Sequence, residues 1–318
     1  MKENNRIPVK NRGNLLGVIL MVGMLSALPL QAYADNHKSW QEPEQGDWFM
    51  SSSITGAYGS YSGSSLRDKF YSAGITFGGE YLEQHGFSVG YTNSTVKFNS
   101  GVETIKQNEY FLSGHRNFNS DGVPGTIDIR LNGHYISNND STGDSDKVAV
   151  VAPLVSYLSY KKSLYADLGY AHSSYQNDLS VSQFSPTIGL GFSNSANWIQ
   201  LRGYFISLSN AARAQGKSST AAAQLKFTHW FSPDNALNLN TLGLTGMLGE
   251  RIYAVDFDSQ AVYNLADVQK GSVAVYLNWK FPGSTYLLFH AGYDRYENLT
   301  INEKYSSSAA VLSLSKEW

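Results

Sequence analysis

The chain has 318 residues, of which 42% are hydrophobic and 16% charged, and its formal net charge is −2. It contains no cysteine, which excludes a disulfide framework, and its near-neutral charge gives no reason to expect a nucleic-acid partner. The mean hydropathy of −0.29 is compatible with membrane-spanning β-strands, because only every second residue of such a strand contacts lipid.

The amino-terminal region, residues 1–34, has the pattern of a secretory signal peptide. A basic leader from Lys2 to Arg12 precedes the apolar run from Leu15 to Leu30, and Ala32-Tyr33-Ala34 then offers a cleavage site. The alternative is an uncleaved anchor, but a run of about 16 residues is short for a membrane span. We therefore expect export through the general secretion pathway, with 35–47 as a periplasmic segment and 48–318 as the membrane domain.

Short alternations of apolar and polar residues repeat from residue 48 onward, separated by turn residues. This period of two predicts an all-β chain of about fourteen antiparallel strands (range 12–16), with a repeat of about 20 residues that suits a transmembrane up-and-down β-barrel. The predicted strands are 48–60, 69–82, 86–98, 104–117, 126–138, 147–160, 164–175, 181–193, 197–209, 218–231, 236–249, 270–281, 284–296 and 304–318.

Aromatic residues flank the shorter connections, which alternate with longer ones. Five of the six tryptophans fall at the same end of the predicted strands, which is typical of an aromatic belt at a membrane interface. Both ends of the barrel segment lie at that rim, so we interpret it as the periplasmic side. The predicted interface anchors are Trp48, Trp198, Trp230, Trp279 and Trp318.

The opposite connections are longer and polar, and we expect them to be extracellular. Residues 139–146 form an acidic loop that lacks the terminal bidentate glutamate of a calcium loop, so it predicts a solvated loop and no metal site. Only 250–269 is large. It could extend strands above the membrane, raising the count to sixteen, or fold into the lumen.

One short motif suggests catalysis. His172 and Ser174 share the predicted lipid-facing parity near the extracellular end of their strand, and this resembles the His-x-Ser arrangement of outer-membrane lipid hydrolases. Those enzymes continue with Ser-Asn, whereas Tyr175 follows here, and the spacing places no third catalytic partner. We therefore predict that the protein is not an enzyme and needs no cofactor, and we keep an outer-leaflet lipid hydrolase as the alternative.

The predicted lumen face carries mostly small residues, such as Ser72, Gly74 and Thr76, which would leave room for water unless 35–47 or 250–269 fills the space. Inward charges are sorted by position: acidic residues predominate on the first strands and basic residues on later ones. This arrangement predicts a transverse field across a channel. The predicted lumen residues are Glu80, Glu109, Asp128, Arg130, Asp167, Arg202, Lys226 and Lys280.

The last strand alternates Ala310, Leu312 and Leu314 with serines and reaches Trp318. It resembles the terminal strand of Gram-negative outer-membrane β-barrels, in which a final aromatic residue is part of the assembly signal, although Lys316 occupies a usually apolar position. In size and rhythm the chain is similar to monomeric fourteen-stranded porins. The resemblance implies contact with outer-membrane lipids and lipopolysaccharide, delivery by periplasmic chaperones to the assembly machinery, and a monomer. We predict a porin-like channel for small polar solutes, with a non-conducting structural or polymer-export barrel as a further alternative.

Overall fold

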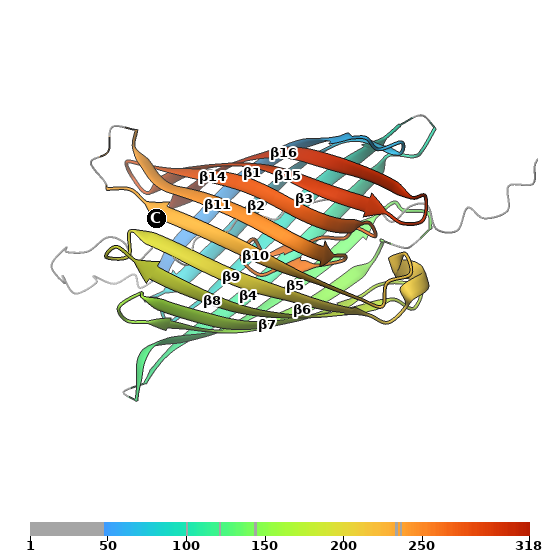
Figure 1. Cartoon of the computed structure of the whole chain (residues 1–318). Helices are drawn as coiled ribbons and strands as arrows, with labels where there is room; N and C mark the ends of the chain where they lie inside the picture. Colours follow the sequence, from blue (N-terminus) through green and yellow to red (C-terminus); the bar gives the residue numbers. More distant parts are fainter. Residues whose placement is uncertain (1–47, 100, 121, 143–144, 233–234, 236) are drawn as a thin grey trace, which may run out of the picture.

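The structure, a computed structural model, describes residues 48–318 except 100, 121, 143–144, 233–234 and 236. Fourteen strands form a closed antiparallel barrel in which each strand pairs with its neighbours in sequence and β1 pairs with β16. The strands run obliquely to the barrel axis, as closure of a sheet requires (Figure 1). The predicted fold class is confirmed. The predicted signal peptide and the segment 35–47 lie outside the described residues.

The wall strands are β1 (Trp48–Ser62), β2 (Arg67–Tyr81), β3 (His85–Phe98), β4 (Ile105–Ser120), β5 (Val123–Asn138), β6 (Val148–Ser159), β7 (Leu164–Ser174), β8 (Ser180–Phe192), β9 (Asn197–Leu208), β10 (Ser219–Trp230), β11 (Leu239–Arg251), β14 (Val268–Phe281), β15 (Thr285–Asn298) and β16 (Glu303–Glu317). Two further strands, β12 (Val255–Asp256) and β13 (Ala261–Val262), form a separate small sheet.

Side chains alternate between the two faces of the wall as the period of two predicts. Leu312 and Leu314 on β16 point outward and are exposed, whereas Ser313 between them is buried and accepts a 2.8 Å hydrogen bond from Thr55 of β1. The outward face is rich in large apolar side chains, as a lipid-facing surface must be.

Trp48 and Trp318 lie at the same end of the barrel, which we call the terminal rim; the opposite end is the loop rim. The ring of Trp48 packs against Tyr81 and Phe87, and the ring of Trp318 lies 6.4 Å from that of Phe77. The exposed Trp48 and Trp318 thus belong to an aromatic cluster outside the barrel.

The prediction that Trp198 anchors the outer surface is wrong. Trp198 is 3% exposed, shares the inward parity of β9 and lies over Gly189, whose added Cβ would come within 2.6 Å of the indole. The glycine therefore makes room for a large side chain rather than for water. Trp230 and Trp279 are half-buried at the ends of β10 and β14.

The barrel closes through its first and last strands. Met50 and Trp318 exchange two backbone hydrogen bonds of 2.9 and 3.0 Å. Lys316, the irregular position on the lipid-facing parity, directs its ammonium group to the Gly283 carbonyl in the turn between β14 and β15. The long stem can thus cross apolar surface while its charge reaches the rim.

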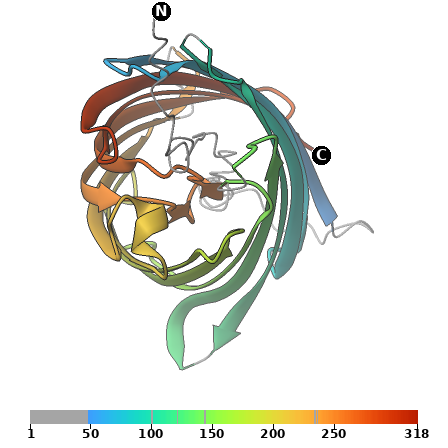
Figure 2. The ribbon, with the colours of Figure 1, turned by 90° about the vertical axis from the view of Figure 1, so that its right-hand side faces the viewer.

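The long connection between β11 and β14 adds no strand to the wall, because β11 pairs directly with β14. The barrel therefore has fourteen strands rather than sixteen. Seen from the loop rim, this connection lies inside the barrel (Figure 2). No helix in the described part of the chain is long and apolar enough to cross a membrane.

Candidate functional site: the inner loop and the lumen

We call residues 252–267 the inner loop. It doubles back on itself through the pairs Val255–Val262 and Asp256–Ala261. The Asp256 carboxylate caps the turn by accepting hydrogen bonds from the backbone N–H groups of Asp258 and Ser259, both at 3.0 Å. Such a side chain–backbone turn fixes a short hairpin without a long ladder.

One face of the inner loop is apolar and packs against the inside of the wall formed by β5 to β9. The contact involves Ile252, Val255, Phe257 and Val262 of the loop, all at most 3% exposed. The wall side of this cluster is Ile136, Val148, Val150, Ala152, Leu154, Ala171, Val181, Ile206 and Leu208. Burial of apolar surface therefore holds the loop against one side of the lumen.

Two wall residues hold the inner loop in place: one binds its backbone, and the other leaves space for one of its side chains. The buried amide of Gln183 on β8 donates to the Val255 carbonyl at 2.6 Å and accepts from the Val255 N–H at 2.9 Å, as a neighbouring strand would. Gly169 on β7 lies under Phe257, and a Cβ there would come within 2.6 Å of the ring.

Asp258, at the tip of the inner loop, neutralises two basic residues of the wall. Its carboxylate lies 2.9 Å from the Arg202 guanidinium and 3.5 Å from the Lys226 ammonium, and it accepts a 3.1 Å hydrogen bond from Gln200. Burial alone would raise the pKa of Asp258, but Arg202 and Lys226 outweigh it and hold that pKa well below its usual range.

Asp256 faces a second basic residue, Arg251 at the end of β11. The two groups are 3.8 Å apart, and Tyr204 donates a hydrogen bond to Asp256 at 3.1 Å. The Arg251 guanidinium also lies 4.3 Å from the centre of the Tyr263 ring. Burial raises the pKa of Tyr263 to about 12, although Arg251 opposes the shift, so this phenol is neutral at physiological pH.

Asp267 anchors the other end of the inner loop. It forms a 2.7 Å ion pair with the buried Arg67 of β2, and Tyr305 and Asn298 donate hydrogen bonds to it at 2.5 and 2.9 Å. β2, β15 and β16 lie on a different part of the wall from β7 to β10. The loop is thus attached to opposite parts of the barrel by carboxylates.

These contacts correct the predicted charge sorting. Arg202 and Lys226 do not stand beside one another in water, because Asp258 pairs with both. Asp167, assigned to the opposing acidic wall, contacts Arg202 directly at 2.9 Å with only β8 between their strands. The basic residues therefore compensate the acidic groups of the inner loop instead of forming one side of a transverse field.

The remaining predicted lumen residues are also paired or near a rim. Glu109 bonds to His134 at 2.9 Å, Glu80 lies 3.2 Å from His115, and Asp128 lies 3.7 Å from Arg130. Lys280 lies near the terminal rim, with its ammonium 5.8 Å from the centre of the Tyr286 ring.

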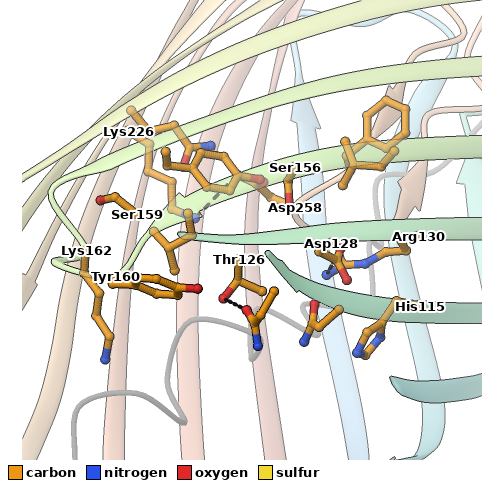
Figure 3. Close-up of a pocket in the computed structure, with 17 residues that line it drawn as sticks. His115, Thr126, Asp128, Arg130, Ser156, Ser159, Tyr160, Lys162, Lys226 and Asp258 are labelled. Atoms are coloured by element: carbon orange, nitrogen blue, oxygen red, sulfur yellow. Dashed lines mark hydrogen bonds and ion pairs between the residues drawn. The ribbon is translucent and has the colours of Figure 1, made fainter. Parts of the chain in front are cut away.

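A cavity of about 320 Å³ lies between the tip of the inner loop and the terminal rim (Figure 3). Its lining combines charged, hydroxyl, amide and tyrosine side chains. These residues are His115, Asn117, Asn119, Thr126, Asp128, Arg130, Leu154, Ser156, Leu158, Ser159, Tyr160, Lys162, Tyr165, Gln200, Lys226, Phe257 and Asp258. The described residues contain no cluster of metal-ligating side chains.

The two candidate hydrolase residues lie away from this cavity. His172 and Ser174 point outward near the loop rim, as their parity predicts. The Nδ1 atom of His172 lies 3.2 Å from the hydroxyl of Ser182 on the neighbouring strand, not from that of Ser174. The geometry thus brings the imidazole to a different serine from the one that the motif suggested.

The sequence also contains a signal for the inner loop that is independent of the period of two. β6 is apolar on both faces, from Val148 through Leu154, whereas a strand between lipid and water should be polar on its inner face. Such a strand indicates that something apolar covers it from inside. The three aspartates within 250–269 are a second signal, because the inward-facing arginines of the wall need acidic partners.

No protein-family profile and no curated protein matches the chain. Among solved structures, it is similar to a bacterial polysaccharide outer membrane secretin, with a TM-score of 0.53 and 8% identity over 85% of this chain and 98% of that one. The fold is less similar to that of a monoaromatic hydrocarbon channel (TM-score 0.48, 8% identity, 85% and 88% coverage) and to that of Omp33 of Acinetobacter baumannii (TM-score 0.45, 8% identity, 86% and 100% coverage). At this identity the likeness to the secretin shows the fold alone, that of an outer-membrane β-barrel.

Proposed function

We propose that this outer-membrane β-barrel is a channel for small polar solutes whose lumen is narrowed by the inner loop. The observation that carries the proposal is the way the loop is fixed: it packs against one side of the wall, and its carboxylates neutralise Arg202, Arg251 and Arg67. A loop fixed inside a barrel narrows the route and sets which solutes pass.

The charged groups beside the inner loop support a route for polar rather than apolar solutes. Lys226 and Asp128 line the cavity, so an apolar solute would have to displace their hydration without replacing it. A polar solute can offer hydrogen bonds in exchange. The proposal places the terminal rim in the periplasm and the loop rim outside the cell.

Single-channel recording of the purified, refolded full-length protein in planar bilayers tests the proposal. We expect small, steady conductance steps from the parent protein. A variant in which residues 254–264 are replaced by a short Gly-Ser linker should conduct several times more, because both the apolar face and the tip of the loop are removed.

Absence of conductance from both proteins, each correctly folded by heat-modifiable migration on gels, would overturn the channel proposal. It would favour the alternative of a non-conducting barrel, which includes the polymer export suggested by the name of the structurally similar secretin. Equal conductance from both proteins would show that the inner loop does not narrow the route.

A further inference from the structure

We propose that the cavity beneath the inner loop is a binding site for a neutral polyhydroxylated solute, such as a short saccharide, that enters from the terminal rim. The inference deepens the proposed function, on which it rests for the route through the barrel but not for binding itself. The volume of about 320 Å³ lies within the range of small-molecule sites.

Most of the ionisable groups that line the cavity have a partner of opposite sign within the protein. Lys226 pairs with Asp258, and Arg130 lies 3.7 Å from Asp128. His115 contacts Glu80 at 3.2 Å. An ionic solute would have to compete with a partner that is already in place, whereas a neutral solute can accept and donate hydrogen bonds without breaking these pairs. The cavity therefore favours neutral over charged ligands.

The uncharged lining offers the two kinds of contact that a sugar ring needs. Hydroxyl and amide groups of Thr126, Asn119 and Ser156 come from three neighbouring strands, with Thr126 donating to Asn119 at 2.9 Å (Figure 3). Tyr160 is 58% exposed at the rim end of the cavity, and the hydroxyl of Tyr165 is held by Asp167 at 2.7 Å. Tyrosine rings present an apolar face to C–H groups, while hydroxyls and amides bind the sugar oxygens.

The position of the cavity indicates the end of the barrel from which a solute enters. On the inner side it ends at Phe257 and Asp258, which are fixed by the contacts of the inner loop. On the other side its lining reaches Ser159 at the end of β6 and Tyr160 and Lys162 in the turn between β6 and β7. A solute therefore reaches the site from the terminal rim.

Isothermal titration of the full-length protein with maltose tests the inference. The detergent must be zwitterionic, because a maltoside headgroup could occupy the site. We expect millimolar binding of maltose and no measurable binding of glucose 6-phosphate or glucosamine at the same concentrations. Tyr160→Ala should weaken maltose binding about fivefold, the effect expected for one lost ring contact.

Tyr135→Ala is the matched control, because this tyrosine lies on β5 but points outward. It should bind maltose like the parent protein. If Tyr160→Ala fails to fold, Thr126→Val serves as the test variant and should also weaken binding.

Absence of maltose binding, binding unchanged in the cavity variant, or tighter binding of glucose 6-phosphate would overturn the inference. Conductance, measured separately, distinguishes the two proposals. A conducting protein that does not bind maltose contradicts only the saccharide site, and a maltose-binding protein that does not conduct contradicts only the channel.

Discussion

The most direct test of the inner loop is removal of the charge at its tip by Asp258→Asn. The substitution keeps the shape of the side chain but leaves Arg202 and Lys226 without the carboxylate that now lies 2.9 and 3.5 Å from them. The loop should detach more often, because an asparagine cannot compensate two cations.

The free-energy cost of Asp258→Asn depends on the partners that Arg202 keeps in the variant. Loss of one partner from a buried ion pair costs about 3–5 kcal/mol. Arg202 keeps Asp167 at 2.9 Å and Thr187 at 2.7 Å, so the lower value for a charge-assisted hydrogen bond, about 2 kcal/mol, is the better expectation. Because 1.4 kcal/mol corresponds to a factor of ten, the detached population should rise about 30-fold.

A thiol placed in the loop measures this population. The chain has no cysteine, so Ala261→Cys in β13 introduces a single thiol at a position that is 2% exposed. A hydrophilic maleimide can react only when the loop leaves the wall, and the labelling rate therefore follows the detached population. We expect labelling to be about 30 times faster when Asp258→Asn is added.

Asp178→Asn, in the connection between β7 and β8, is the charge-matched control and should leave the labelling rate unchanged. Acidification adds a second check. Because the pKa of Asp258 is held well below its usual range, its contribution is present above about pH 4 and is lost only as the pH falls through the lowered pKa. The ratio of the labelling rates of Asp258→Asn and the parent protein should thus be constant between about pH 7 and 5, because the falling thiolate fraction slows both reactions equally. Equal rates for parent and Asp258→Asn would refute the view that these ion pairs hold the loop.

Three further outcomes are expected. Deletion of Trp318 should impair assembly, because it removes the ring contact with Phe77 and two backbone hydrogen bonds, and normal heat-modifiable migration would show that it is dispensable. An epitope tag within 139–146 should bind antibody on intact cells and a tag after Ser232 should not; the reverse pattern would invert the orientation. Detergent-solubilised protein should release no fatty acid from phospholipid, and hydrolysis that Ser174→Ala abolishes would restore the hydrolase alternative.

The wall of the barrel could be predicted from the sequence because strand parity is a local property. Every predicted wall strand begins and ends within three residues of the observed one; the largest shifts include β11, predicted to begin at 236 and observed from Leu239. Its register changes between Leu239 and Thr241 and again between Leu248 and Arg251, and such irregularities interrupt the alternation from which strand ends are predicted.

The contents of the lumen could not be predicted in the same way, because parity gives the face of a residue but not its partner. Arg202 was correctly placed on the inner face, yet its partner Asp258 is 56 residues away in a segment without alternation. Glycines on the inner face were also ambiguous. Gly169 and Gly189 have the pattern of an open lumen, but they lie under Phe257 and Trp198.

Closure of the wall between β1 and β16 has a consequence for how the protein reaches its membrane. Thr55 and Ser313 are 258 positions apart and yet share a hydrogen bond, so the first strand must wait for the last before its edge is paired. Contacts of such long sequence separation form slowly, and meanwhile both edges can pair with other chains. The outward side chains, already apolar, are exposed to water during the same interval. We therefore expect a barrel of this design to need protection of its unfolded form in transit as much as stability of its finished wall.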